Sequence, residues 1–263
     1  MHPWSLVTPA SRGIGLELAR RLLRTTSIPV VATARKDLDQ TRENILTGLE
    51  GNCEDRLSVL RVDVTDESSM ADAASTCAAQ LDPKTNYLHL AFALPGLLFP
   101  EKSPTQIDAA NALLTFQTNT LGPLLLLKHF SRFLPRKSTA ISTDIDGLPP
   151  QAVWATMSAR VGSIGDNRLG GWYSYRASKA GVNQITKTFD NNLRTAAADK
   201  AIAIALHPGT VKTELSREFW GNVKEEKLFS AEFSAERLIE VVKGVGVKGR
   251  GKCWDWKGEE IPP

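Results

Sequence analysis

Short apolar runs alternate along the chain with longer stretches in which apolar residues recur every three to four positions. Six runs rich in β-branched and apolar residues predict buried strands at 5–8, 30–33, 57–62, 88–93, 152–157 and 201–206. The stretches with helical spacing predict helices at 14–26, 38–49, 68–81, 105–133 and 175–197. Strands separated by helices pair in parallel through right-handed crossovers, which place helices on both faces of the sheet. The pattern therefore predicts a doubly wound α/β fold.

Two interruptions change this picture locally. Pro123 lies inside the fourth predicted helix, so we expect a kink or bulge just before it, because proline cannot donate a helical hydrogen bond. Residues 135–151, which contain Gly147-Leu148-Pro149-Pro150, predict a surface loop inserted ahead of the fifth strand. No internal repeat or linker divides the chain. Its 263 residues are therefore expected to form a single domain, 1–263.

Charge and composition exclude several classes of protein. The chain has 32 lysines and arginines against 29 aspartates and glutamates, and no cluster of five basic residues, so nucleic acid is not an expected partner. The most apolar stretch, 88–99, is shorter than the roughly 20 residues that span a membrane. A strand-like run begins at Trp4 and leaves no room for a signal peptide. Three widely spaced cysteines suggest reduced thiols, and the histidine spacing suggests no metal site, so we expect a cytoplasmic protein.

A glycine-containing turn follows the first predicted strand. It reads Thr8-Pro9-Ala10-Ser11-Arg12-Gly13-Ile14-Gly15 and leads directly into the first predicted helix. Glycines at such a turn let a pyrophosphate approach the backbone, and the helix N-terminus supplies N–H donors. Two glycines alone would also suit an ordinary turn. Their place between strand and helix favours a dinucleotide site.

Basic residues near this turn indicate which dinucleotide the site would bind. The second predicted strand is followed by Arg35-Lys36, where an NAD site would place an acid for the ribose 2′-hydroxyl. Together with Arg12 in the turn, Arg35 favours the 2′-phosphate of NADP(H) over NAD(H). Asp63, after the third strand, is placed to accept from the adenine amino group, or alternatively to cap a loop.

Candidate catalytic residues lie in the second half of the chain. Tyr175 and Lys179 are four residues apart near the start of a predicted helix and therefore share one face. A nearby ammonium lowers the pKa of a tyrosine hydroxyl and fits it for proton exchange. Ser158 ends the fifth strand, and Asn119 lies just before Pro123. The tight turn from His207 to Thr213 follows the sixth strand and would face a nicotinamide amide.

In their order and spacing, these motifs resemble the short-chain dehydrogenase/reductase family over essentially the whole chain. The segments 158–163, 170–179 and 254–262 resemble its C-factor-like, carbonyl-reductase-like branch. The resemblance implies a Rossmann fold with about seven strands. It also implies cofactor contacts by Thr8, Ser11, Arg12, Gly13, Ile14, Gly15, Arg35, Asp63, Val64, Gly96, Pro208, Gly209, Val211 and Thr213.

The resemblance also implies a mechanism. Tyr175 would donate a proton to a carbonyl oxygen while hydride leaves the nicotinamide. Lys179 would bind the nicotinamide ribose and lower the pKa of Tyr175, and Asn119 would hold a water that connects Lys179 to solvent. A serine would orient the carbonyl.

Three departures from the family pattern bear on activity. Pro9 replaces the first motif glycine, and the family's Asn-Asn-Ala-Gly after the fourth strand appears here as Ala93-Leu94-Pro95-Gly96. Ala159 stands where the family has its serine. Ser158 is favoured for that role over Ser163, and it requires a bulged or twisted strand end because neighbouring strand residues point to opposite faces.

Two classes of function remain open. The intact Tyr175, Lys179 and Asn119 favour an NADPH-dependent carbonyl reductase, or the reverse alcohol dehydrogenase. The departures favour a dinucleotide-binding signalling or scaffold protein with little turnover. Residues 214–231 resemble a substrate lid, and Phe219, Trp220, Leu228 and Phe229 suggest an apolar substrate, although they would equally cover the core. The fourth and fifth helices resemble those that pair between subunits, so we expect a homodimer or homotetramer.

Overall fold

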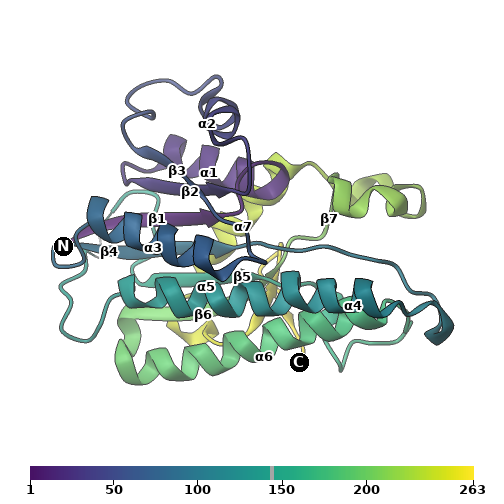
Figure 1. The fold of residues 1–263 in the computed structure, drawn as a ribbon. Coiled ribbons are helices and arrows are strands. Elements are labelled where there is room, and N and C mark those ends of the chain that lie inside the picture. The colour runs from purple at the N-terminus through teal and green to yellow at the C-terminus, as the bar shows by residue number, and fades with distance from the viewer. Residues whose placement is uncertain (143–144) are drawn as a thin grey trace.

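An eight-stranded sheet forms the centre of the molecule in the computed structural model, which describes residues 1–142 and 145–263 (Figure 1). Its strands, in spatial order, are β3 (Leu57–Arg61), β2 (Val30–Ala34), β1 (His2–Thr8), β4 (Asn86–Ala93), β5 (Ala152–Met157), β6 (Ala201–His207), β9 (Cys253–Asp255) and β10 (Glu260–Ile261). All neighbours pair in parallel except β9 and β10. The doubly wound fold is therefore confirmed. The strand order reverses between β1 and β4, and ligands of such sheets bind outside the carboxyl ends of the strands at this point.

Helices cover both faces of the sheet, as the alternation predicts. One face carries α1 (Gly13–Thr25), α2 (Leu38–Leu46) and α7 (Ala231–Val245), and the other carries α3 (Glu67–Gln80), α4 (Ala109–Phe116), α5 (Gly122–Phe130) and α6 (Tyr173–Ala196). Each face has its own apolar core. On β1, Val7 belongs to the core under α1, whereas Leu6 belongs to the core under α3 and α5. Because neighbouring apolar residues of one strand point to opposite faces of the sheet, helices must cover both faces to bury them.

The six predicted strands are all present, and β5 coincides with its predicted run. The sequence reasoning missed α7 and the β9–β10 hairpin. A signal for α7 exists, because the Ser230 hydroxyl accepts a hydrogen bond from the Phe233 amide and caps the helix. Leu238, Ile239 and Val242 then follow with helical spacing and are buried.

The single helix predicted at 105–133 is wrong in extent. Pro104–Gln106 form a separate 3₁₀ turn, and α4 begins after Asp108, whose carboxylate accepts from the Asn111 amide. A π-helical turn, Gln117–Leu121, joins α4 to α5, and Pro123 occupies the first turn of α5. The irregularity expected just before Pro123 is thus confirmed. Pro123 lacks a backbone N–H, and this lack is tolerated in the first turn of a helix, where the N–H would have no partner within the helix.

The predicted loop at 135–151 has neither helix nor strand in its described parts, 135–142 and 145–151; residues 143–144 lie outside the description. Its second half packs inward. Leu148 contacts the core under α1, and the Pro149 carbonyl lies 2.8 Å from the Nε2 atom of His89 on β4. Within the described ranges, no helix combines the length and hydropathy that crossing a bilayer requires.

His89 makes the stability of the protein depend on pH. Burial lowers its pKa to about 4, so the folded protein keeps this imidazole neutral in a range where the unfolded chain binds a proton. The free energy of unfolding should therefore fall as the pH falls from about 6.5 to about 4. Urea unfolding at several pH values should show a shallower fall of the free energy of unfolding in His89→Gln than in the wild type. In this variant the unfolded chain has no imidazole at position 89 to take up a proton. His207, whose pKa burial also lowers to about 4, contributes to the slope that remains.

The exposed His2 provides the control for this measurement. His2→Gln should retain the wild-type pH dependence. An equally steep fall in His89→Gln and in the wild type would contradict the assignment.

Candidate active site

The turn between β1 and α1 is built by close backbone approach. A Cβ atom on Gly15 would lie 2.0 Å from the Pro9 carbonyl oxygen, so only glycine fits there. Gly13 has a φ of +57°, and a Cβ atom on it would lie 3.2 Å from Cγ2 of Thr213. The turn therefore lies against the segment after β6, and two of the predicted cofactor segments meet.

The start of α1 suits an anionic ligand. Arg12 is the N-cap residue, its side chain makes no capping hydrogen bond, and the first turn of α1 contains no acid. The first amides of a helix lack partners within the helix, and the helix dipole favours negative charge near them. The diphosphate of a dinucleotide matches both properties. Ser11 and Ile14 flank this point and are half-buried.

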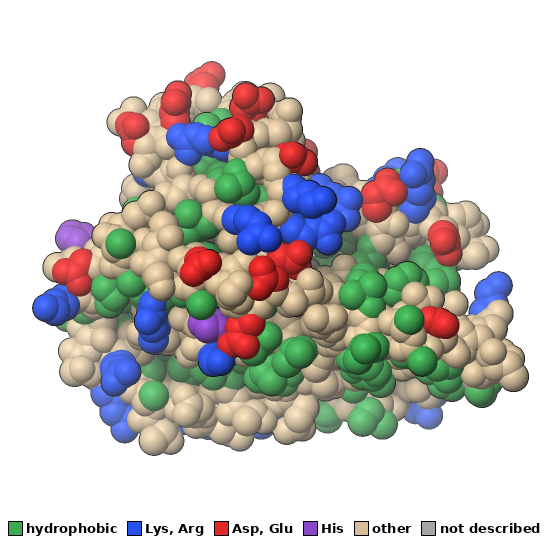
Figure 2. Space-filling model, viewed as in Figure 1, with side chains coloured by type: hydrophobic (Ala, Val, Ile, Leu, Met, Phe, Trp, Pro, Cys, Tyr) green, Lys and Arg blue, Asp and Glu red, His purple; other side chains and the backbone are tan. Residues whose placement is uncertain are grey.

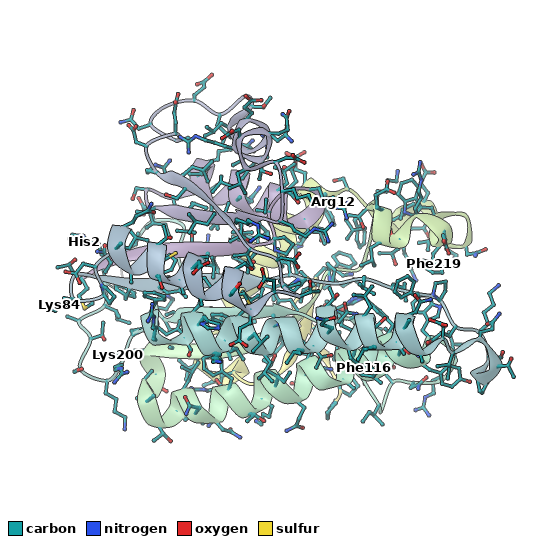
Figure 3. All side chains as sticks on the ribbon, in the orientation of Figure 1. His2, Arg12, Lys84, Phe116, Lys200 and Phe219 are labelled. Carbon is teal, nitrogen blue, oxygen red and sulfur yellow. The ribbon has the colours of Figure 1, made fainter. Side chains whose placement is uncertain are left out.

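Basic side chains gather beside this helix start. Arg12, Arg35 and Lys36 are exposed, and Figure 2 shows a group of basic side chains in the region where Figure 3 labels Arg12. Partial burial raises the pKa of Asp63, but hydrogen bonds from Thr65 and the charges of Arg35 and Arg61 outweigh it and lower the pKa below its usual value. Arg35 thus lies close enough to Asp63 to influence its charge.

Asp63 also caps its own turn. Its Oδ1 atom accepts hydrogen bonds from the amide and the hydroxyl of Thr65, at 3.0 and 2.7 Å. Thr8 is buried, and its hydroxyl accepts a 2.7 Å bond from Thr33. Both side chains therefore have structural partners, and their contacts with a cofactor stay predictions.

The other predicted cofactor residues lie on the segments that follow β3, β4 and β6. Val64 packs against Gly122. A Cβ atom added to Gly122 would lie 3.0 Å from the Cβ atom of Val64. Gly96 is exposed after β4. Pro208 and Gly209 follow β6, and the next residues form the short strand β7 (Thr210–Val211), which ends two residues before Thr213.

Tyr175 and Lys179 lie buried together in the first turns of α6. The Lys179 Nζ atom lies 5.8 Å from the centre of the Tyr175 ring and donates a 2.8 Å bond to the Met157 carbonyl at the end of β5. It also lies 3.6 Å from where a Cβ atom on Gly96 would be. Gly162 permits this packing, because a Cβ atom there would lie 2.8 Å from the Cβ of Lys179.

Both members of this pair have shifted pKa values. Burial raises the pKa of Tyr175 to about 12 and lowers that of Lys179 to about 8. In the protein without a nicotinamide, the loss of water around the hydroxyl dominates. A lowered Tyr175 pKa in the presence of Lys179 and an oxidised nicotinamide stays a prediction. At neutral pH the Tyr175 hydroxyl is protonated and can donate.

Asn119 occupies the π-helical turn and is completely buried. Its Oδ1 atom accepts from the Leu97 amide at 2.8 Å, and its Nδ2 atom donates to the Leu97 carbonyl at 2.8 Å. The same Nδ2 atom lies 3.1 Å from the hydroxyl of Ser178, one residue before Lys179. Asn119 thus joins the loop after β4 to α6, and its role as a water ligand stays a prediction.

The two candidate serines have other partners. The Ser158 hydroxyl donates to Oδ1 of Asn183 at 2.6 Å, which directs it toward α6. The Ser163 hydroxyl contacts the Pro263 carbonyl at 3.4 Å and accepts from the Asp166 amide at 3.0 Å. Both hydroxyls therefore have partners within the protein, and a role of either serine toward a substrate carbonyl stays a prediction.

Aromatic rings adjoin Tyr175. The Trp172 ring centre lies 6.1 Å from that of Tyr175 and 4.8 Å from that of Phe219. Phe219 belongs to a 3₁₀ helix, Glu214–Asn222, in the predicted lid segment. Figure 3 places Arg12 and Phe219 toward the same side of the molecule, opposite Lys84. The two ends of the predicted site, cofactor turn and aromatic segment, therefore share this side.

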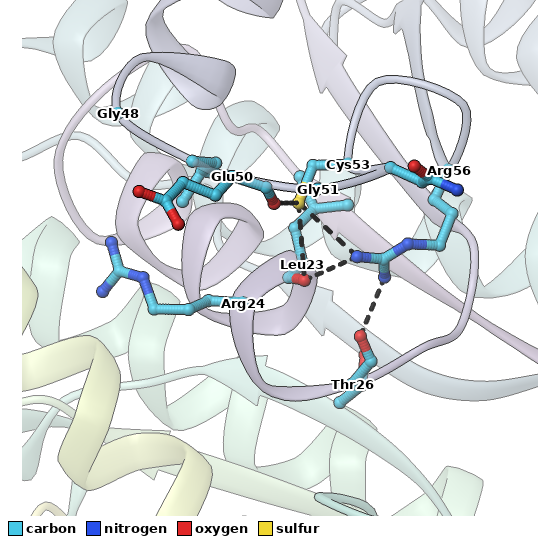
Figure 4. Close-up of a pocket in the computed structure, with 10 residues that line it drawn as sticks. Leu23, Arg24, Thr26, Gly48, Glu50, Gly51, Cys53 and Arg56 are labelled. Atoms are coloured by element: carbon cyan, nitrogen blue, oxygen red, sulfur yellow. Dashed lines mark hydrogen bonds between the residues drawn. The ribbon is translucent and has the colours of Figure 1, made fainter.

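A separate cavity of about 400 Å³ lies at the other end of α1 (Figure 4). Its wall includes Arg56, which donates to the carbonyls of Leu23 and Thr26 at 2.7 and 2.8 Å. Both terminal nitrogens of its guanidinium group therefore donate to backbone carbonyls. These bonds join the segment before β3 to the end of α1. Within the described ranges, no group of three or more histidines, cysteines or acids is arranged to hold a metal ion.

Comparison with known proteins agrees with this geometry. A short-chain dehydrogenase model described as Enoyl-(Acyl carrier protein) reductase matches residues 9–243. The chain belongs to the short-chain dehydrogenase/reductase family. This match spans the turn between β1 and α1, the π-helical turn and the Tyr175–Lys179 pair, so the resemblance seen in the sequence is confirmed.

Individual members of the family are similar over most of the chain. The 1-hydroxy-2-glutathionyl-2-methyl-3-butene dehydrogenase of Rhodococcus sp. is 29% identical and covers 73% of this chain and 74% of its own. The C-signal protein of Myxococcus xanthus is 29% identical over 59% of this chain and 81% of its own. The NADPH-bound carbonyl reductase from chicken fatty liver superposes over the whole of both chains with a TM-score of 0.82 and 27% identity.

Proposed function

We propose that this short-chain dehydrogenase/reductase is an NADPH-dependent enzyme that reduces ketone or aldehyde carbonyls to alcohols, or catalyses the reverse reaction. The observation that carries this proposal is the buried Tyr175–Lys179 pair. Lys179 bonds to the Met157 carbonyl at the carboxyl end of β5, and α1 with its basic residues begins after the carboxyl end of β1, so both features lie at the same edge of the parallel sheet. The likeness to an NADPH-bound carbonyl reductase supports the same reaction class.

The residues present fit NADP(H) better than NAD(H). The amides around Ser11, Gly13, Ile14 and Gly15 would hold the diphosphate, and Arg12 and Arg35 would bind the 2′-phosphate. Asp63 and Val64 would border the adenine. On the nicotinamide side, the contacts would come from Thr8, Gly96, Pro208, Gly209, Val211 and Thr213. Bound NADPH supplies a hydride to the carbonyl carbon.

The side chains of α6 would complete the reaction. Tyr175, protonated at neutral pH, donates its hydroxyl proton to the carbonyl oxygen as that oxygen gains negative charge. Lys179 would hold the hydroxyls of the nicotinamide ribose. Its ammonium group would also stabilise the phenolate that Tyr175 becomes when it loses its proton. Asn119 keeps the loop after β4 against α6 and would hold the water that returns a proton. Ser158 orients the carbonyl, with Ser163 as the alternative.

Nucleotide titration followed by a substrate panel tests this proposal. The intrinsic tryptophan fluorescence of the purified protein should report tighter binding of NADPH than of NADH. Apolar ketones and aldehydes should then accelerate NADPH oxidation, because Trp172 and Phe219 present apolar surface beside Tyr175. If neither nucleotide binds, Pro9 and the loss of the family's Asn-Asn pair at Ala93-Leu94 have closed the cofactor site, and the proposal fails.

Arg35 should determine the preference between the two nucleotides. We expect Arg35→Ala to weaken NADPH binding roughly 10- to 100-fold and NADH binding less than about threefold, because only NADPH carries the 2′-phosphate. Fluorescence titration measures both affinities. Arg24→Ala, in the last turn of α1, is the control and should leave both unchanged. Equal weakening of the two nucleotides in Arg35→Ala would contradict the assignment.

A second candidate function is a dinucleotide-binding signalling or scaffold protein with little turnover. The observation that favours it is that the Ser158 hydroxyl already donates to Asn183, while Ala159 stands at the family's serine position. Substitution of Tyr175 separates the two candidates, because a scaffold would keep its output without this hydroxyl.

Two further features of the molecule support proposals about its assembly and its location. An apolar surface on α4, α5 and the turn between them comprises Leu113, Leu114, Phe116, Leu121 and Leu124, all exposed. This surface favours a homodimer or homotetramer, which sedimentation would detect. The three cysteines are free and buried, which favours a cytoplasmic location with reduced thiols.

A further inference from the structure

Glu101 binds the start of α6 from a distant loop. It lies between β4 and α4, and only 3% of its surface is exposed. Its Oε2 atom accepts a 2.7 Å bond from the Ser174 amide, and its Oε1 atom accepts a 2.6 Å bond from the Ser174 hydroxyl. Its backbone carbonyl accepts a 2.6 Å bond from the Trp172 amide. Three bonds from one residue thus hold the two residues that flank Tyr173.

The start of α6 requires such support. Gly170, Gly171 and Trp172 all have positive φ values, of +65°, +67° and +51°. Trp172 is the N-cap residue, and its side chain makes no capping bond. For a tryptophan the left-handed region is intrinsically unfavourable, and it persists only where surrounding contacts impose it. The bond from the Trp172 amide to the Glu101 carbonyl is one such contact.

The carboxylate of Glu101 replaces the missing cap. Ser174 is the second residue of α6, and its amide is one of those that find no acceptor within the helix. Glu101 supplies that acceptor, and its negative charge lies at the positive end of the helix dipole. Tyr175 directly follows Ser174, so the bonds of Ser174 fix the backbone from which the Tyr175 side chain projects.

The same loop reaches the other catalytic candidates. Leu97 exchanges two hydrogen bonds with Asn119, and the Cβ position of Gly96 lies 3.6 Å from Nζ of Lys179. Residues 96–101 therefore contact Lys179 at one end and hold the turn before Tyr175 at the other. A change at Glu101 would alter the position of Tyr175 relative to Lys179.

We propose that Glu101 is a positioning residue of the active site, which fixes the Tyr175 hydroxyl and the Trp172 ring against the substrate carbonyl. The proposal rests on the carbonyl reductase function above. A displacement of about 1 Å can cost roughly 100-fold in rate, so loss of Glu101 should lower kcat. NADPH affinity should change little, because the start of α1 and its basic residues lie on other elements.

Two substitutions separate bonding from charge. Glu101→Ala removes both acceptors for Ser174. Glu101→Gln keeps the shape: its carbonyl oxygen can accept from the Ser174 amide while its NH₂ group donates to the Ser174 hydroxyl. Lys102→Ala, at the exposed neighbouring position, is the control.

The experiment compares kcat and KM with an accepted ketone, the Kd for NADPH, and amide hydrogen exchange of residues 172–176 in the nucleotide-free protein. In Glu101→Ala we expect kcat to fall roughly 10- to 100-fold, Kd to change less than about threefold, and exchange to accelerate. Glu101→Gln and Lys102→Ala should stay near wild type in all three. Unchanged kcat in Glu101→Ala, or an equal loss in Glu101→Gln, would overturn the proposal.

Failure of the proposed function has a different signature. If the wild-type protein binds NADPH but reduces no carbonyl, the function is wrong, and hydrogen exchange still tests Glu101. Exchange at 172–176 that is as slow in Glu101→Ala as in the wild type would then overturn the positioning role.

Discussion

Replacement of Tyr175 by phenylalanine should lower carbonyl turnover by about 10²- to 10⁴-fold, the contribution of a positioned proton donor. The change removes only the hydroxyl from a side chain that is 7% exposed, so the fold and the NADPH affinity should persist. Steady-state kinetics with an accepted ketone, together with fluorescence titration of NADPH, measure both quantities. Affinity retained with turnover lost would assign the proton to Tyr175.

Tyr173 provides a matched control for this prediction. It precedes Tyr175 by two residues, and 40% of its surface is exposed. Tyr173→Phe should therefore retain most of the activity. Turnover that survives in Tyr175→Phe would contradict its role as proton donor and would favour the scaffold function, provided that any cellular output also survives.

The buried ion pair between Asp190 and Arg250 should have the largest effect on stability. Asp190 on α6 is fully buried and accepts from Nε of Arg250 at 2.9 Å and from the Ala203 amide at 3.1 Å. Removal of the Asp190 charge leaves the buried Arg250 with only the exposed carboxylate of Asp199, 3.3 Å from its Nη1 atom, as a counterion. Loss of the buried partner of such a pair costs about 3–5 kcal/mol. Asp190→Asn should lower the free energy of unfolding in urea by this amount.

Arg194 tests whether burial of the Asp190–Arg250 pair is the reason for the large loss of stability. It contacts the same carboxylate at 3.2 Å, but 52% of its side chain is exposed. Arg194→Ala should cost less than about 1 kcal/mol, as exposed ion pairs do. A loss in Asp190→Asn no greater than in Arg194→Ala would show that the pair with Arg250 adds little to stability.

Much of the fold could be predicted because its signals are local. The runs that become β2, β5 and β6 are rich in apolar residues and almost wholly buried, as strands covered on both faces must be. The kink before Pro123 follows from the chemistry of a single residue. The helix α7 was missed despite its cap at Ser230, and β9 is only three residues long. A run that short carries no periodicity of its own.

The site could be predicted only where residues of one segment act together. Tyr175 and Lys179 share a helix face, and their spacing alone predicts the contact. Glu101 binds Ser174 across 73 positions of sequence, so nothing near Glu101 indicates its role. The direction of the Ser158 hydroxyl depends on Asn183, which lies on another element. The raised pKa of Tyr175 depends on burial by the assembled fold.

Hydride transfer from labelled NADPH tests the proposed reaction most directly. The purified protein would be incubated with a panel of apolar ketones and aldehydes and with NADPH that carries deuterium at both C4 positions of the nicotinamide. Mass spectrometry should find one deuterium at the carbinol carbon of the alcohol produced by the wild type, and far less product from Tyr175→Phe. NADPH that binds tightly while no carbonyl acquires deuterium would contradict the carbonyl reductase function.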